Sequence, residues 1–166
     1  EPPAGSIEVT VVGHRWWWEF DYGDLGITTA GELHLPLTKD GEPQSVFLTL
    51  ESADVIHSFW VPEFRVKQDA VPGAVNVLRV TPNVIGNYKV RCAELCGVGH
   101  HTMRGAVIVE EQSNYDSWLA NYPTYKDTKQ RLAGNSDFGA SQYAVCAACH
   151  GQQGEGSPLL NAPKIA

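Results

Sequence analysis

Five side chains that bind soft metal ions lie within twelve residues of this sequence. The segment 92–103 reads Cys-Ala-Glu-Leu-Cys-Gly-Val-Gly-His-His-Thr-Met and carries two thiols, two imidazoles and a thioether. Thiolate and imidazole ligands favour copper, zinc or iron–sulfur centres over calcium or magnesium. Structural zinc sites use thiolates, imidazoles and carboxylates, so the methionine favours copper. Because two thiolates four residues apart can bridge a pair of ions, the segment predicts a binuclear copper site.

The order of these residues resembles the copper loop of cytochrome c oxidase subunit II, which holds the binuclear centre called CuA. The family pattern Cys-x-Glu-x-Cys-x-x-x-His-x-x-Met is matched here by Cys92, Glu94, Cys96, His100 and Met103. The resemblance implies that both cysteines bridge the coppers and that His100 is a terminal ligand. It also implies that Met103 and the Glu94 carbonyl are axial ligands. Spacing alone does not separate His100 from His101.

The second imidazole of such a centre comes from an earlier segment. Residues 54–62 read Asp-Val-Ile-His-Ser-Phe-Trp-Val-Pro and are similar to the family segment Asp-Val-x-His-Ser-x-x-x-Pro. The resemblance therefore implies that His57 is the other terminal ligand. It further implies that the Glu94 carboxylate binds magnesium at the interface with another subunit.

Two simpler interpretations of the Cys92 and Cys96 pair stay open. In the first interpretation, the two thiols form a disulfide in an oxidising compartment. With His57 and His100 they instead satisfy a tetrahedral zinc site. The other histidines of this part of the chain have no partner pattern and are expected to be surface or hydrogen-bonded residues: His14, His34 and His101.

A binuclear site needs a rigid frame, and residues 1–112 show a pattern of short strands. Apolar and polar residues alternate, or β-formers gather, in 7–12, 32–37, 45–50, 75–81, 86–91 and 104–110. Turns rich in glycine and proline separate these segments. The pattern and the resemblance together predict an all-β, cupredoxin-like Greek-key barrel or sandwich. The ligands are then expected in loops at one end of it.

Three consecutive tryptophans, residues 16–18, follow the first predicted strand. Neighbours on a strand point to opposite faces, so at least one ring faces away from the core. The run is similar to the family segment Gly-His-x-Trp-x-Trp, whose first tryptophan lies where electrons are taken up. This resemblance implies the same role for Trp16. Three carboxylates are expected beside the exposed ring: Glu19, Asp21 and Asp24.

The character of the chain changes after residue 112. Ser113 and Asn114 precede Tyr115, Trp118 and Leu119, which predicts a short amphipathic helix capped by the two polar residues. Polar residues without periodicity follow, so 113–136 is interpreted as a helix and linker between a copper domain, 1–112, and a further segment, 137–166.

The last segment contains the motif Cys-x-x-Cys-His, which is typical of c-type haem attachment. In this role Cys146 and Cys149 bind haem covalently and His150 ligates its iron. Only sixteen residues follow His150, and none is a methionine or histidine that could be the distal ligand. We therefore expect the truncated start of an α-helical cytochrome c module, with haem c absent or incomplete.

Charge and hydropathy limit the partners. Residues 1–112 hold 8 Lys and Arg against 15 Asp and Glu, so the net charge of −7 falls in this part. A basic nucleic-acid footprint is absent, and an acidic surface suits a basic partner such as cytochrome c. No run approaches the ~18 apolar residues of a membrane helix. The start at Glu1-Pro2-Pro3 is expected to follow a missing membrane anchor.

The resemblance implies a function for the whole pattern. It is that of the CuA domain of a terminal cytochrome c oxidase of the haem-c-fused subclass, at the periplasmic or outer face of a bacterial cytoplasmic membrane. Electrons would pass from fused or separate cytochrome c to the haem of catalytic subunit I, where dioxygen is reduced. One alternative is the CuA domain of nitrous oxide reductase, which usually has tryptophan at the position of Glu94. Another is a copper carrier or assembly protein, which needs no bridging thiolate pair in a barrel.

Overall fold

The computed structural model describes residues 2–127, 143, 147–148, 150–153 and 155–156. The chain divides into two compact units, Glu1–Tyr125 and Lys126–Ala166, and each is described by itself. Cys146 and Cys149 of the haem motif lie outside the described residues, whereas His150 is described. The haem motif and the predicted boundaries of the last segment therefore stay predictions. No helix in the described part of the chain is long and apolar enough to span a bilayer.

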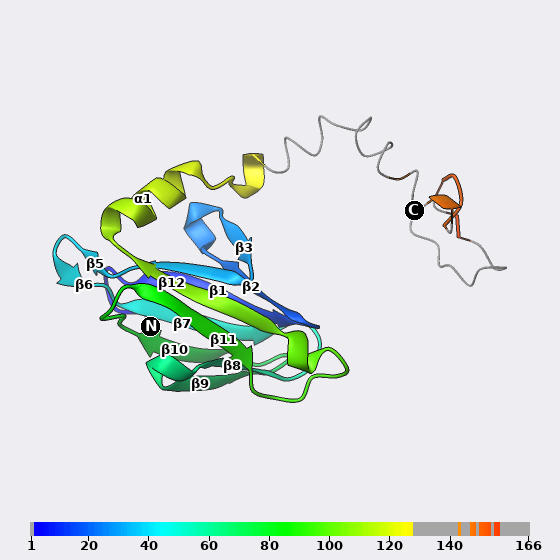
Figure 1. Cartoon of the computed structure of the whole chain (residues 1–166), viewed down its shortest axis with the longest axis horizontal. Helices are drawn as coiled ribbons and strands as arrows, with labels where there is room; N and C mark the ends of the chain where they lie inside the picture. Colours follow the sequence, from blue (N-terminus) through cyan, green and yellow to red (C-terminus); the bar gives the residue numbers. More distant parts are fainter. Residues whose placement is uncertain (1, 128–142, 144–146, 149, 154, 157–166) are drawn as a thin grey trace. The chain divides into compact units, whose positions relative to one another are not determined.

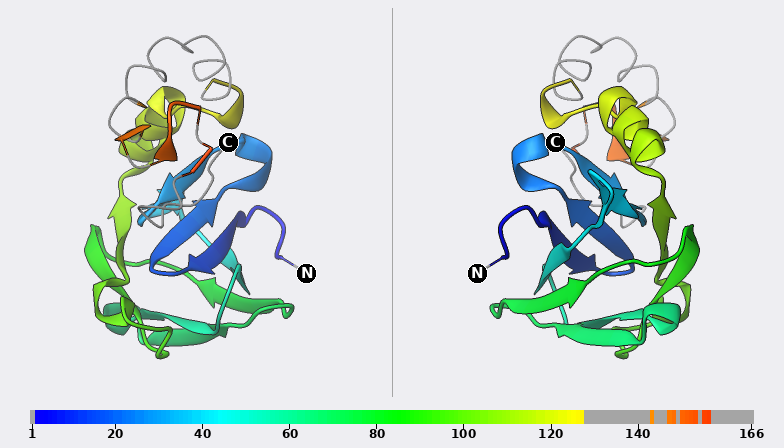
Figure 2. Two further views of the ribbon diagram at one scale, coloured as in Figure 1. Left: turned by 90° about the vertical axis from the view of Figure 1, so that its right-hand side faces the viewer. Right: turned by 90° about the vertical axis from the view of Figure 1, so that its left-hand side faces the viewer.

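The first unit is built from two five-stranded sheets that face each other (Figures 1 and 2). The strands of the first sheet, in the order β10-β7-β1-β2-β3, are Asn76–Val80, Val46–Ser52, Ile7–His14, Trp17–Asp21 and Thr28–Ala30. The strands of the second, in the order β4-β12-β11-β8-β9, are Glu32–Pro36, Arg104–Glu110, Gly86–Cys92, His57–Val61 and Val66–Ala70. The all-β prediction is confirmed.

Smaller elements connect the strands. A two-stranded ribbon consists of β5, Thr38–Lys39, and β6, Glu42–Pro43. Three 3-10 turns cover Gly23–Leu25, Pro62–Phe64 and His100–Thr102. The segment with two prolines, 61–73, contains β9 at the edge of its sheet, as expected where proline cannot donate to a central ladder.

The core lies between the two sheets and follows the period of two. In β1 and β2 the buried residues alternate with partly exposed ones. Trp18 is 0% exposed and meets Phe59 of the opposite sheet edge to face, with ring centroids 5.4 Å apart. Phe20 makes a similar contact with Phe59 at 6.2 Å. These aromatic contacts fix the spacing between β2 and β8, the strand that begins with His57.

Helix α1, Gln112–Asn121, is held to the sandwich by aromatic packing. The Trp118 ring stacks on His34 of β4 at 4.3 Å, and Tyr115 is buried beside it. The Tyr22 hydroxyl accepts a hydrogen bond from the His34 N–H and donates one to the His34 carbonyl. The helix begins at Gln112, before the predicted cap residues Ser113 and Asn114, and no side chain caps it. The predicted cap is wrong because packing of the aromatic face, rather than a local cap, stabilises this helix.

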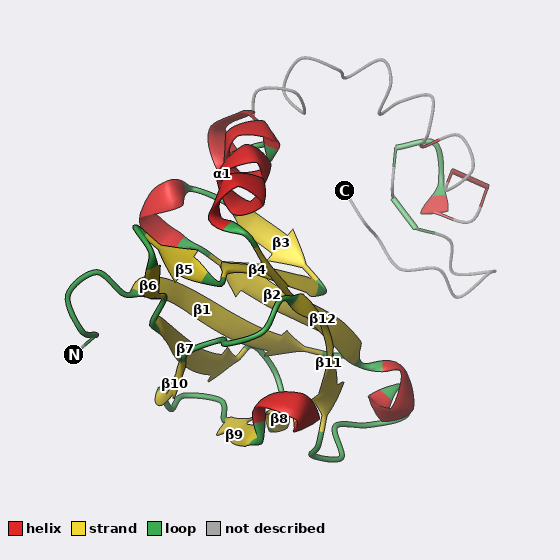
Figure 3. Cartoon of the chain, turned by 60° about the vertical axis from the view of Figure 1, so that its left-hand side comes forward, coloured by secondary structure: helices red, strands yellow, loops and turns green. Residues whose placement is uncertain are grey.

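Replacing Trp118 with alanine is expected to lower the free energy of unfolding by about 2 kcal/mol, because the ring is only partly buried and a fully buried tryptophan contributes about 3–5 kcal/mol. Urea unfolding of the full chain measures this change. Strand β12 leads from Met103 to α1, so the helix lies at the far end of the sandwich from the loop 93–103 (Figure 3). Copper binding should therefore be unchanged, and its loss in this variant would contradict the separation.

Candidate metal centre

Two strands and one loop bring the predicted ligands to one end of the sandwich. His57 is the first residue of β8 and Cys92 is the last residue of β11. Hydrogen bonds hold the ends of the loop 93–103 that follows Cys92. The Cys92 N–H donates to the Met103 carbonyl at 3.2 Å. The Ala93 N–H also donates to the Ser58 carbonyl at 2.9 Å. The loop is thus anchored at both ends to strands of the same sheet.

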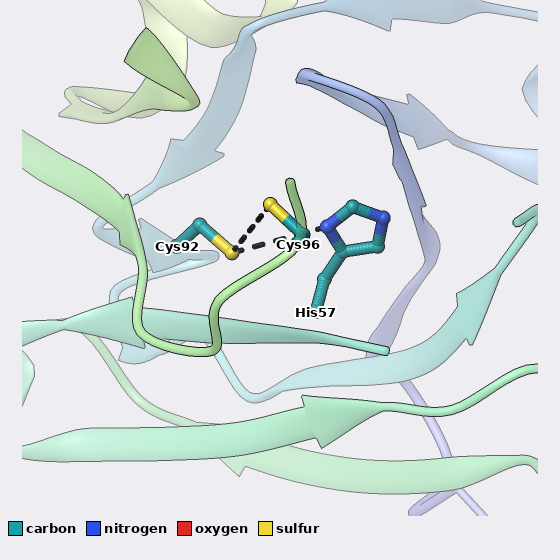
Figure 4. Close-up of side chains that lie close together, drawn as sticks. All are labelled: His57, Cys92 and Cys96. Atoms are coloured by element: carbon teal, nitrogen blue, oxygen red, sulfur yellow. Dashed lines mark hydrogen bonds between the residues drawn. The ribbon is translucent and has the colours of Figure 1, made fainter. Parts of the chain in front are cut away.

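The two cysteine sulfurs form the middle of the cluster. The Sγ atoms of Cys92 and Cys96 lie 3.8 Å apart, far beyond the roughly 2.05 Å of a disulfide. The Cys92 Sγ lies 3.9 Å from the Nδ1 atom of His57 and 3.2 Å from the Glu94 carbonyl oxygen. Figure 4 shows the His57, Cys92 and Cys96 side chains pointing toward one another. Their ligand atoms all lie within 4.8 Å of one another.

The remaining predicted ligands surround the other sulfur. The Cys96 Sγ lies 3.6 Å from the His100 Nδ1 and 3.8 Å from the Met103 Sδ. The six predicted ligands are therefore brought together around two unbonded thiols. His101 is exposed and its carbonyl accepts a hydrogen bond from Arg104. This donor set suits soft ions such as copper, because thiolates, imidazoles and a thioether surround the same small volume.

Burial differs between the two imidazoles. His57 is 0% exposed, and Cys96 and Met103 are buried as well, whereas His100 lies at the half-exposed rim. Burial raises the pKa of the Cys96 thiol to about 11, and the neighbouring Cys92 adds to this shift. In the metal-free protein Cys96 is therefore a neutral thiol at pH 7, which limits the cost of burying it.

Copper affinity is expected to increase with pH. Metal binding requires thiolates, so the Cys96 proton must leave when the ion binds. Since the pKa of about 11 lies above the working range, the apparent affinity should increase by up to about tenfold per pH unit for each proton released. Titrations against a competing chelator between pH 6 and pH 8 measure this slope. A pH-independent affinity would contradict this expectation.

The three tryptophans take different places. Trp18 points into the core, and Trp17 points outward, where its ring stacks on His14 at 4.3 Å. The Trp16 ring lies over the metal loop, and its Nε1–H donates to the Cys96 carbonyl at 3.1 Å. A Cβ atom at Gly97 would lie 3.3 Å from this ring, and one at Gly99 would overlap it. The two loop glycines therefore make room for Trp16, a role that sequence reasoning missed.

The carboxylates predicted beside the exposed ring are only partly there. Glu19 lies at this end of the hairpin and accepts a hydrogen bond from His14 at 3.1 Å. Asp21 pairs with Thr10, and Asp24 lies in the turn after β2. The prediction is wrong for these two residues because β2 runs away from the metal loop.

Asp54 is the first matched residue of segment 54–62, but its contacts at the site were not predicted from the sequence. One carboxylate oxygen lies 2.8 Å from the His57 Nε2 and accepts from the Val55 N–H at 2.7 Å. The other accepts from the Arg15 N–H at 2.8 Å. Partial burial pushes the pKa of Asp54 upward, but the hydrogen bonds from His57, Val55 and Arg15 outweigh it and hold this pKa at about 2. The carboxylate is ionised at neutral pH.

Comparison with known proteins agrees with this geometry. Residues 35–111 match the family model described as the periplasmic domain of cytochrome c oxidase subunit II. The sandwich belongs to the cytochrome c oxidase subunit II family, as its periplasmic domain. The crystal structure of the periplasmic domain of cytochrome oxidase subunit II (CoxB) from Bradyrhizobium japonicum superimposes with a TM-score of 0.65 at 26% identity. That match covers 77% of this chain and 97% of the other, and the predicted cupredoxin-like fold is confirmed.

Curated relatives carry the same family name. Cytochrome c oxidase subunit 2 of Thermostichus vulcanus is 48% identical over 115 residues, which cover 69% of this chain and 33% of the relative. Cytochrome c oxidase subunit 2 of Alkalihalophilus pseudofirmus is 33% identical over 159 residues, which cover 95% of this chain and 45% of the relative. The chain thus spans a third to about half of the length of these subunit II relatives.

Proposed function

We propose that this subunit II domain carries a binuclear copper centre that accepts electrons from cytochrome c and passes them to the haem of catalytic subunit I in a terminal oxidase. The observation that carries the proposal is the pair of unbonded thiols 3.8 Å apart, each with an imidazole nitrogen within 3.9 Å. The proposed ligands are His57, Cys92, the Glu94 carbonyl, Cys96, His100 and Met103. Copper bound there would supply reversible one-electron transfer.

The protein itself would supply ligands that are held in fixed positions and are largely shielded from water. Hydrogen bonds of the loop backbone to β8 and to Trp16 hold the donor atoms near one another without a metal. Burial of His57, Cys96 and Met103 excludes water from most of the site. A frame that changes little between oxidation states lowers the reorganisation that each electron transfer requires.

Trp16 is the proposed uptake residue because its ring lies over the copper loop and its Nε1–H donates a hydrogen bond to the Cys96 carbonyl. Replacing it with phenylalanine keeps a ring but removes the N–H bond to the Cys96 carbonyl. We expect the rate of electron uptake from reduced cytochrome c at low salt to fall several-fold, measured by stopped-flow absorbance. Trp17→Phe is the matched control, because Trp17 lies one residue away and is 39% exposed. Equal rates in both variants would refute the role of Trp16.

Two further groups belong to the proposal. The Glu94 side chain is exposed, so its carboxylate is free to bind magnesium at the interface with subunit I while its carbonyl faces Cys92. Cys146, Cys149 and His150 would attach haem c, as in the haem-c-fused subclass. Neither group is needed for the copper centre itself.

Copper reconstitution of the full chain tests the proposal. Two ions per chain, intense thiolate-to-copper absorption bands and an electron spin shared by both nuclei are expected. One copper with the spectrum of a mononuclear blue site would contradict it. Preferential binding of a single zinc ion would support the zinc interpretation instead. The same visible spectrum also reports whether haem is attached.

A further inference from the structure

One carboxylate connects two segments that carry different parts of the proposed centre. Asp54 lies between the ligand His57 on one side and the turn that carries Trp16 on the other. It contacts the imidazole at 2.8 Å through Oδ1 and the Arg15 backbone N–H at 2.8 Å through Oδ2. The Arg15 guanidinium adds a weaker contact at 3.6 Å. The backbone bond reaches across 39 residues of sequence.

The chemistry of this contact fixes which imidazole nitrogen is available to a metal. An ionised carboxylate only accepts hydrogen bonds, so the Nε2 atom of His57 must carry the proton that lies toward Asp54. In a neutral imidazole the Nδ1 atom then has a free lone pair. Nδ1 is the nitrogen that faces the Cys92 sulfur at 3.9 Å. Asp54 therefore selects the tautomer that a copper ion at this place requires.

The ring of His57 has little freedom to turn. Trp18 contacts it edge to face, with centroids 6.0 Å apart, and Gly13 of β1 lies directly against it. Asp54 contacts the only polar ring atom that does not face the cysteines. Its other oxygen holds the turn from which Trp16 extends over the loop to the Cys96 carbonyl. The contacts thus form a closed ring. It runs from Asp54 through His57, Cys92 and Cys96 to Trp16, and the neighbouring Arg15 bonds Asp54 again.

We propose that Asp54 is a positioning residue that sets the tautomer and ring plane of His57 and also holds the Trp16 turn in register with the copper loop. The inference rests on the proposed function, because it assumes that His57 Nδ1 is a copper ligand. It assigns one residue to two tasks, ligand orientation and placement of the electron-uptake ring. Loss of Asp54 should therefore change both.

Two substitutions and one control test the proposal in the full chain. Asp54→Ala removes both hydrogen bonds, whereas Asp54→Asn keeps an acceptor of the same shape without the charge. Glu19→Gln is the matched control, because Glu19 also bonds a histidine of the same hairpin, His14, which is not a proposed ligand. Loss of an outer-shell partner typically costs 10–100-fold in metal affinity, so we expect about 100-fold for alanine and about tenfold for asparagine. Glu19→Gln should change affinity less than twofold.

The readouts separate positioning from simple stability. Nitrogen NMR of the metal-free chain reports the tautomer of His57, which should be Nε2–H in the parent and mixed in Asp54→Ala. In the copper-loaded chain, the nitrogen hyperfine coupling of one histidine should change. An unaltered tautomer in Asp54→Ala, or unaltered copper affinity and spectrum, would overturn the proposal even if the protein became less stable. If Asp54→Ala does not fold, Asp54→Asn decides by the same measurements.

The outcome for Asp54 is distinguishable from that for the proposed function. If the parent chain does not bind two coppers, the function fails, but the tautomer experiment on metal-free protein still tests whether Asp54 orients His57. If the parent binds two coppers and Asp54→Ala binds them equally well, only the positioning role fails.

Discussion

Substituting Cys96 with serine will eliminate the binuclear copper centre. Both proposed ions depend on the same two sulfurs, which lie 3.8 Å apart. Removing one thiolate therefore weakens both sites together, and serine offers a poor ligand for soft copper. Copper analysis should fall from two ions per chain to one or none, with loss of the spin signal shared by two nuclei. Cys92→Ser should give the same result.

A pair of adjacent histidines provides the control. His100→Ala should also reduce the copper content, because its Nδ1 lies 3.6 Å from the Cys96 sulfur. His101→Ala should leave both ions in place, because this exposed side chain is not among the proposed ligands. A Cys96→Ser variant that kept two coppers and the parent spectrum would rule out the bridging assignment.

Gly13→Ala should damage the site from the opposite sheet. A Cβ atom at Gly13 would lie 2.7 Å from Cδ2 and 3.0 Å from Cγ of the His57 ring. Strand β1 cannot move away easily, because Gly13 is paired with Trp18 on one side and Ser52 on the other. The His57 ring must therefore shift, at a cost of about 1–3 kcal/mol in the free energy of unfolding.

The substitution has two measurable effects and a matched control. Urea unfolding of metal-free chain should show the loss of stability, and chelator competition should show weaker copper binding. Gly86→Ala is the control, because a Cβ there would meet only the end of the Tyr88 ring at 3.2 Å, at the far end of β11 from Cys92. If Gly13→Ala bound copper as tightly as Gly86→Ala, the contact with His57 would be unimportant for the centre.

Local sequence patterns were sufficient for most of the strands and for locating the loop of candidate ligands, whereas the choice of His100 over His101 rested on the family resemblance. Five of the proposed ligands follow one another within a single loop, and the alternation in 7–12 or 104–110 reflects a sheet with one buried face. The placement of His57 depended on a family resemblance, since no local spacing connects it to residue 92. The structure brings the two side chains together through the pairing of β8 with β11.

The contacts that were missed join segments distant in sequence. Gly13 lies against His57 because β1 and β8 belong to facing sheets. Arg15 bonds Asp54 because β1 pairs with β7 in the same sheet, so the segments that follow these two strands lie side by side. His34 and Trp118 meet because β12, which leads to α1, pairs with β4. Periodicity records which face of a strand is buried, but it does not record which residue of another strand it meets.

The unequal burial of the two imidazoles gives the centre a direction. His57 is enclosed by Gly13, Trp18 and Asp54, whereas His100 lies at the rim between Val98, which is 87% exposed, and the solvent-facing His101. Because His57 is 0% exposed and His100 is half-exposed, an ion delivered to the folded protein meets the His100 side of the centre first. We expect a copper donor to release its ion at His100 and His57 to be the last ligand that binds it. Copper loading and copper removal should therefore follow the same route.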